Sequence, residues 1–283
     1  LEDQLGPILI LELIGFRQGL TQCQYWRDLI IKKIINFLKR KYLIKNYKLN
    51  KIIKEQENKY SNLNLNRETG LEILKKLKEK YNFLERPMSS EHEVIFSSIS
   101  NSNKHIKNIL EIGTFDGNNC FLLSLLFPNS IIKTIDLPEK DDDFIKFYNR
   151  ENIVEKFIEK RSRIIEKRKN IDFENLNSLN LINKKDKYDL IWIDGAHGYP
   201  HVCIDIINSL KLISENGIIM CDDVFKNKQA KQDKMYNSIA SYETLKALEK
   251  ENLIKLSFFY KRLNSINNYD KEKIKYIAFF QKK

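Results

Sequence analysis

Acidic residues end two apolar segments in the second half of this 283-residue chain. Asp194 follows the segment Leu190–Ile193, and Asp222 and Asp223 follow the segment Ile218–Cys221. Adjacent carboxylates repel each other unless a positive charge lies near them. If both segments are parallel strands, the three carboxylates meet at one edge of a sheet. They then form a site suited to Mg²⁺ or another hard divalent cation.

A histidine, His197, lies three residues after the first of these acids. An imidazole with an ordinary pKa of about 6.5 can take a proton from a hydroxyl near neutral pH. A hydroxyl that also binds a cation loses its proton more easily, because the cation lowers its pKa. We therefore expect His197 to act as a general base. The alternative is a structural hydrogen bond within the turn.

A glycine-containing turn follows another apolar segment, Ile109–Ile112. Glu111, Gly113 and Gly117 form the pattern Glu-x-Gly-x-x-x-Gly, and Asn119 would begin the helix that follows. Glycine permits a sharp turn and a close approach of the backbone to a ligand such as a nucleoside. The pattern differs from Gly-x-Gly-x-x-Gly, with which dinucleotide-binding proteins hold a pyrophosphate at a helix N-terminus.

A further acid, Asp136, stands at the end of the next apolar segment, Ile131–Ile135. It follows the glycine turn by about 20 residues, the separation at which an acid binds ribose hydroxyls in nucleotide-binding sheets. Taken alone, the turn fits any strand-to-helix connection, and Asp136 fits a helix cap. Their combination favours a nucleoside-binding loop.

Short apolar segments alternate with helical segments from about residue 105 onward. This alternation predicts an α/β fold with a doubly wound, mostly parallel, seven-stranded sheet. The predicted strands are Ile109–Ile112, Ile131–Ile135, Ile171–Phe173, Leu190–Ile193, Ile218–Cys221, Leu256–Arg262 and Lys275–Gln281. The predicted helices of this part are Asn119–Phe127, Phe144–Lys160, Tyr199–Ile213 and Ser241–Asn252. Such sheets bind ligands at the carboxyl ends of their strands, where the acids and glycines lie.

Residues 1–85 are predicted to form an α-helical N-terminal extension before a domain over residues 86–283. Helical periodicity covers Trp26–Tyr42 and Glu68–Tyr81, with a polar loop around Asn58–Asn66. The first helix is basic and amphipathic, which favours packing on the domain or on a second subunit of a homo-oligomer. The alternative is peripheral contact with an anionic membrane.

The formal net charge is +11, but only 10 of the 49 basic residues are arginines. Specific nucleic-acid sites rely on arginine forks, so we expect a solvated lysine surface and no specific nucleic-acid partner. The four cysteines lack metal-ligand spacing and indicate a reducing, cytoplasmic environment. No apolar stretch reaches the roughly 20 residues that span a bilayer, so we expect neither a transmembrane segment nor a signal peptide.

Residues from about 108 to 283 resemble the class I S-adenosylmethionine-dependent methyltransferases, which share a Rossmann-like fold. Within this class they are similar to the cation-dependent O-methyltransferases, both the catechol type and the macrolide and aminocoumarin sugar types. The resemblance implies that these residues contact the cofactor: Glu111, Gly113, Gly117, Asn119, Asp136, Asp194 and, near the adenine, Ser178. It also implies that Asp194, Asp222 and Asp223 bind the metal, and that His197 stands where these enzymes have their catalytic base.

Two further expectations come from this resemblance. The base is lysine in the catechol type and histidine or aspartate in sugar-acting enzymes, so His197 favours the sugar-acting branch. The segment before the domain borders the cofactor in related enzymes, which makes Met88 and Ser90 additional candidates. His92 and His105 are expected to be incidental.

The expected reaction is methyl transfer from S-adenosylmethionine to a hydroxyl of a small molecule or sugar, assisted by Mg²⁺ or another divalent cation. One alternative keeps the cofactor without the metal and uses a nitrogen or another atom as the acceptor. Another alternative is a protein that retains the fold without catalysis.

Overall fold

The computed structural model describes two compact units, Leu1–Tyr47 and Lys48–Lys283. The described residues are 31, 33–35, 37–38, 41–42, 48–81, 90–103, 105–139, 141–142, 144, 154–228, 238–264 and 273–283. In the first unit the described residues are helical, and the rest of the predicted helix Trp26–Tyr42 lies outside the described residues. None of the described helices is long and apolar enough to cross a membrane.

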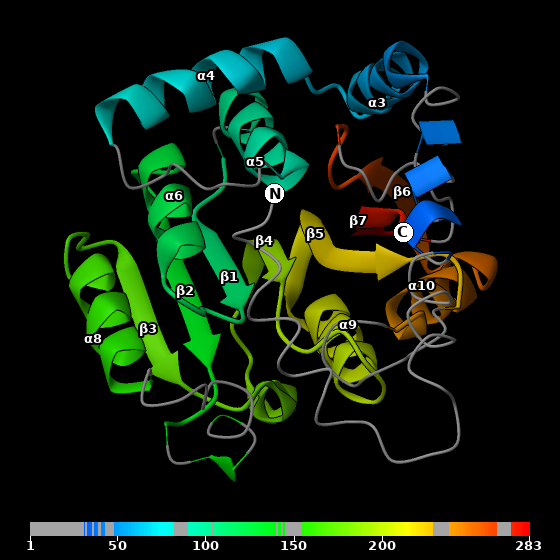
Figure 1. The fold of residues 1–283 in the computed structure, drawn as a ribbon. Helices are drawn as coiled ribbons and strands as arrows, with labels where there is room; N and C mark the ends of the chain where they lie inside the picture. Colours follow the sequence, from blue (N-terminus) through cyan, green and yellow to red (C-terminus); the bar gives the residue numbers. More distant parts are fainter. Residues whose placement is uncertain are drawn as a thin grey trace, which may run out of the picture. The chain divides into compact units, whose positions relative to one another are not determined.

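Within the described residues of the second unit, seven strands form one sheet in the order β3-β2-β1-β4-β5-β7-β6 (Figure 1). Strands β1 to β5 are parallel, and β7 runs antiparallel to both of its neighbours. The strands are β1 (Asn108–Ile112), β2 (Ile131–Asp136), β3 (Ile171–Asn175), β4 (Tyr188–Ile193), β5 (Ile213–Phe225), β6 (Ile254–Tyr260) and β7 (Lys275–Lys282). The predicted doubly wound, mostly parallel, seven-stranded sheet is confirmed.

The central strands read as continuous apolar segments because helices cover both faces of the sheet. One core contains Ile109 and Trp192, and the other contains Leu110 and Ile191, as the alternation of side chains along a strand requires. The first core is packed by α3 (Leu49–Asn62), α4 (Arg67–Lys80), α5 (Glu91–Ser102) and α6 (Asn118–Leu126). The second is packed by η2 (Ser178–Asn183), α9 (His201–Leu212) and α10 (Ala240–Lys250). Helix α8 (Val154–Ile165) follows β2 and lies beside β3 in Figure 1.

The register of the sheet brings four predicted site residues into one row. Ile112 of β1 pairs with Ile135 of β2 and Ile193 of β4, and Ile193 pairs with Cys221 of β5. The next residue of each strand or turn is Gly113, Asp136, Asp194 or Asp222. The chain also reverses its direction of strand addition between β1 and β4, which is where such sheets bind ligands.

The helices before β1 differ from the prediction. Helix α3 extends to Asn62, so the predicted loop around Asn58–Asn66 is wrong over its first half. The buried residues of α3 are Gln56 and Tyr60. Because both carry polar groups, the sequence shows no clear apolar face for this helix. Helix α5 was not predicted, because its buried surface includes polar side chains on every turn and shows no amphipathic stripe.

The compact unit that contains the sheet begins at Lys48, so α3 and α4 belong to it. Helix α4 packs directly against α5. The predicted division between residues 85 and 86 falls among residues 82–89, which lie outside the described residues, as does Met88.

Candidate functional site

The turn after β1 depends on Gly113, whose φ of +98° lies in the left-handed region. Its N–H donates a hydrogen bond to the carbonyl of Ile135 at 2.9 Å. A Cβ on Gly113 would lie 2.4 Å from the carbonyl oxygen of Asp194, closer than real Cβ atoms approach. Only glycine therefore allows β1 and β4 to end side by side. Gly117, with a φ of +79°, then caps the N-terminus of α6.

Glu111 is completely buried beneath this turn. Its carboxyl accepts hydrogen bonds from Asn119 Nδ2 at 2.8 Å and from Thr134 Oγ1 at 2.5 Å. Burial raises the pKa of Glu111 to about 8, and these two hydrogen bonds only partly oppose the rise. The described geometry therefore gives Glu111 and Asn119 a first task, which is to join β1, β2 and α6 under the turn.

Asp136 joins the glycine turn to the end of β2. Its Oδ2 accepts the N–H of Phe115 at 2.9 Å, and its Oδ1 accepts the N–H of Leu137 at 2.9 Å. The carboxyl is buried, which raises its pKa. Each oxygen has a second lone pair for a ligand hydroxyl. The pairing of the predicted turn with the predicted acid is thus direct.

Arg161 of α8 supports Asp136, and the sequence motifs do not include it. Its side chain is 1% exposed, with Nη1 3.7 Å from Asp136 Oδ2 and Nη2 3.1 Å from Glu139 Oε1. Three aromatic rings surround the guanidinium, which lies 4.5 Å from the ring centroid of Phe173 and 5.8 Å from those of Phe144 and Phe157. The guanidinium thereby places a fixed positive charge behind the acid.

The sequence predicted that the strand ends at Cys221 and that the acid pair follows it. In the structure the pair lies inside β5. Strand β5 continues to Phe225, and its register with β7 shifts between Cys221 and Val224. Asp223 adopts a φ of +51° within this irregularity. A bulge re-aims side chains, and here both carboxylates are buried.

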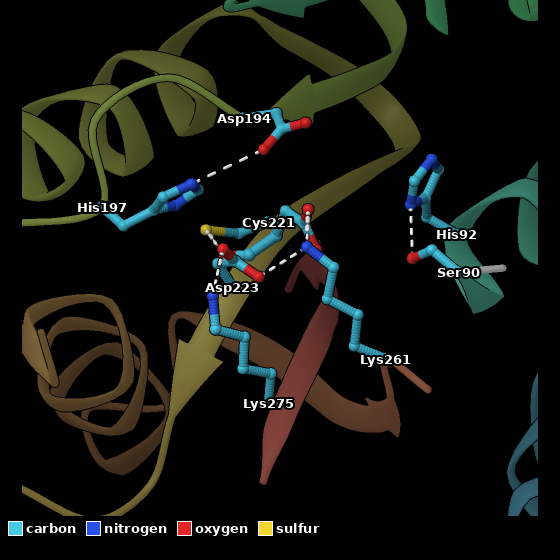
Figure 2. A network of polar contacts seen from close by, with 9 residues as sticks. Ser90, His92, Asp194, His197, Cys221, Asp223, Lys261 and Lys275 are labelled. Atoms are coloured by element: carbon cyan, nitrogen blue, oxygen red, sulfur yellow. Dashed lines mark hydrogen bonds and ion pairs between the residues drawn. The ribbon is translucent and has the colours of Figure 1, made fainter. Parts of the chain in front are cut away.

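Two lysines of the β6–β7 hairpin neutralise this pair (Figure 2). Lys261 Nζ lies 2.5 Å from Asp222 Oδ2 and 2.5 Å from Asp223 Oδ1, and Lys275 Nζ lies 2.6 Å from Asp223 Oδ2. Burial would raise the pKa of Asp223, but the charges of Lys261, His197 and Lys275 hold it well below its usual range. The same ion pairs raise the pKa of Lys261 against its burial.

His197 and Asp194 lie close together. His197 Nε2 lies 3.5 Å from Asp194 Oδ1, and the ring is almost fully buried. Burial alone would lower the pKa of His197, but the hydrogen bond to Asp194 and the nearby carboxylates raise it. Burial and the charge of Asp222 raise the pKa of Asp194 to about 6. The imidazole is therefore a stronger base than an isolated histidine.

Ser178 lies at the start of η2, where its side chain hydrogen-bonds to Asp205 of α9. Asp205 is buried, and burial raises its pKa to about 6. The charge of His197 reaches Asp205 and opposes this rise. Asp205 was not predicted, because a single acid inside an amphipathic helix carries no sequence signal.

The N-terminus of α5 borders the same cluster (Figure 2). Ser90 Oγ lies 2.8 Å from His92 Nδ1, and the N–H of Glu91 donates to the carbonyl of Lys261 at 2.8 Å. The His92 ring lies 5.1 Å from the ring of Trp192 in β4. The candidate Ser90 is thus near the site. His92, which the sequence analysis expected to be incidental, lies beside Ser90.

Residues 110–224 match the model of a family described as a methyltransferase domain. This part of the chain is therefore similar to a methyltransferase domain. The match runs from β1 to the acid pair of β5 and therefore includes every predicted site residue except the additional candidates Met88 and Ser90. No curated protein matches the chain in sequence.

Solved structures with a similar course of the chain include methyltransferases of several kinds. A putative O-methyltransferase from Klebsiella pneumoniae is 14% identical, with a TM-score of 0.46, over 66% of this chain and 78% of its own. The O-methyltransferase TomG from Streptomyces achromogenes, in complex with S-adenosylmethionine, is 12% identical, with a TM-score of 0.47, over 80% and 95%. The N-methyltransferase NodS from Bradyrhizobium japonicum is 13% identical, with a TM-score of 0.45, over 68% and 94%. Likenesses this distant do not distinguish between acceptors.

The segment that matches this family does not present the predicted acids as metal ligands. Among the described residues, no group of three or more histidine, cysteine or acidic side chains is arranged to hold a metal ion. The carboxylates of Asp222 and Asp223 already face ammonium groups. Mg²⁺ requires several oxygen ligands in near-octahedral geometry, and an ammonium between two of them leaves no such set. The residues present therefore do not fit a divalent cation.

Proposed function

We propose that this chain is an S-adenosylmethionine-dependent methyltransferase that methylates a hydroxyl of a small molecule or sugar. The observation that carries the proposal is the pair of the buried His197 and the partly exposed Asp194 at the strand edge where the glycine turn also lies. The pair supplies a base for a hydroxyl proton, and an amine acceptor has less need of such a base.

The cofactor would lie over the turn after β1. Gly113 and Gly117 leave the backbone open to close approach, and Asp136 offers its remaining lone pairs to ribose hydroxyls. We assign Ser178 to the adenine side and Asp194 to the side of the reacting group. Glu111 and Asn119 act mainly by holding the turn from below.

S-adenosylmethionine supplies an electrophilic methyl carbon on a positively charged sulfur. His197 would take the proton of the acceptor hydroxyl, which would leave the oxygen able to accept the methyl group that the bound cofactor would supply. Asp194 stabilises the resulting imidazolium, because its carboxylate lies 3.5 Å from Nε2. The buried walls around His197 exclude water, which strengthens this charge pair.

Divalent-cation assistance is not part of the proposal, because lysine ammonium groups pair with the acids that would bind the ion.

Calorimetry with S-adenosylmethionine and a radiolabelled methyl-transfer screen test the proposal. We expect one cofactor site per chain and transfer to hydroxyl acceptors, with sugars and catechols in the screen beside amines. Transfer to amines alone would replace the oxygen acceptor with nitrogen. Absence of cofactor binding by the folded protein would show that the chain retains the fold without the activity.

A further inference from the structure

Lys261 lies between the two acids of β5, and Figure 2 shows its side chain directed at Asp223. Its ammonium makes one short ion pair with each carboxylate, and its side chain is 9% exposed. One ammonium group therefore pairs with two of the three carboxylates that the sequence assigned to a metal.

The position of this lysine is fixed through its backbone as well as its side chain. The N–H of Lys261 donates to the carbonyl of Lys275 at 3.0 Å, and the carbonyl of Lys261 accepts the N–H of Glu91 at 2.8 Å. A long lysine side chain loses rotamer freedom on burial, which two short ion pairs and a held backbone offset. The ammonium is thus built into the site.

The charges around the site are already close to balance. Asp194, Asp222 and Asp223 contribute three negative charges when ionised, against the positive charges of Lys261 and Lys275. His197 adds a third positive charge when it is protonated. A divalent ion added to this set would face two ammonium groups at close range and would overcompensate the acids.

We propose that the ammonium of Lys261 is the resident cation of this site, in place of a divalent metal ion. The methyltransferase then holds its acid edge together without any metal, and Asp194 is left to pair with His197. This inference rests on the proposed function only for its catalytic meaning, because the occupancy of the acid edge is a property of the folded chain.

The test uses Mn²⁺ as a paramagnetic probe on the full chain after treatment with a chelator. Electron paramagnetic resonance measures how much added Mn²⁺ remains free. For the wild type we expect no stoichiometric binding, and we expect methyl transfer to be the same with and without chelator. One Mn²⁺ bound per chain, lost in Asp222→Asn, would overturn the inference.

A substitution provides the converse measurement. Lys261→Met keeps the length of the side chain but removes its charge, so we expect Mn²⁺ affinity to rise by at least about tenfold over wild type. The double variant Lys261→Met/Asp222→Asn should lose this gain. Lys255→Met, on an exposed position of β6, is the matched control and should leave Mn²⁺ binding at the wild-type level. Unchanged Mn²⁺ binding in a folded Lys261→Met variant contradicts the inference.

Lys261→Met leaves two buried acids without their partner and risks misfolding. If it does not fold, the wild-type Mn²⁺ titration decides the question by itself. Calorimetry with S-adenosylmethionine on the same wild-type sample separates this inference from the proposed function. If the chain binds both the cofactor and one Mn²⁺, only the proposal that Lys261 is the resident cation is wrong. If the chain does not bind the cofactor, only the proposed methyltransferase function is wrong.

Discussion

Gly113 faces the main-chain carbonyl of Asp194 so closely that a Cβ on the glycine would lie 2.4 Å from that oxygen. The two residues follow adjacent parallel strands, and their contact sets the distance between the cofactor turn and the acid that pairs with His197. The absence of a side chain at Gly113 therefore allows the predicted nucleoside-binding turn to lie next to the predicted catalytic residues.

We expect Gly113→Ala to lower the free energy of unfolding and to abolish cofactor binding. The left-handed φ alone costs a residue with a Cβ on the order of 1–3 kcal/mol, and the overlap with Asp194 adds to it. Urea unfolding and calorimetry with S-adenosylmethionine measure the two effects. Gly195→Ala is the control, because its Cβ would meet its nearest neighbours at 3.7 Å, an ordinary contact. Equal effects of the two substitutions would contradict this account.

His197→Gln should lower kcat by about 10²–10⁴-fold, the usual contribution of a general base, and leave cofactor affinity unchanged. In the wild type kcat should rise with pH and level off above a pKa higher than that of a free histidine, because only neutral imidazole accepts a proton. The variant should lose this rise. The exposed His105 provides the control substitution His105→Gln. A wild-type pH profile in the variant would remove His197 from the mechanism.

Glu111 makes stability depend on pH in a defined direction. The unfolded chain releases this proton near the ordinary value of 4.5, whereas the folded chain holds it up to about 8. The stabilisation is therefore complete below pH 4.5 and is lost as the pH rises toward 8, by at most about 1.4 kcal/mol per pH unit. Glu111→Gln cannot titrate, so its free energy of unfolding should fall less than that of the wild type between these pH values. Parallel curves from urea unfolding would contradict the raised pKa.

Arg161→Lys should weaken the binding of S-adenosylmethionine by about tenfold, the equivalent of one lost hydrogen bond. Lysine keeps the charge, but its single ammonium cannot contact Asp136 and Glu139 together. The planar guanidinium of Arg161, held between aromatic rings, contacts both. Calorimetry measures the change. Arg163→Lys, on the exposed face of the same helix, is the control and should bind like the wild type. Equal affinities in all three proteins would show that Arg161 does not position Asp136.

The sheet and the carboxyl ends of its strands could be predicted, because buried parallel strands are short apolar segments whose next residues meet at one edge. Asp136, Asp194 and Gly113 stand in one row for that reason.

The countercharge could not be predicted from the sequence. Lys261 and Lys275 come from a hairpin far along the chain, and nothing in a lysine-rich sequence marks two lysines as buried. Their role depends on the antiparallel pairing of β7 with β5, which brings Lys275 opposite Phe225. Helix α5 stayed hidden for a similar reason, since its polar residues are buried by tertiary contacts that local periodicity does not report.

The separation of these charges along the chain has a consequence for synthesis. The three carboxylates lie directly after β4 and within β5, whereas the two ammonium groups come later, directly after β6 and within β7. During translation the parallel half emerges first and carries an acidic edge that repels itself. The nascent sheet can therefore close its ligand edge only when the hairpin has left the ribosome, so that completion of the fold waits for the last strands.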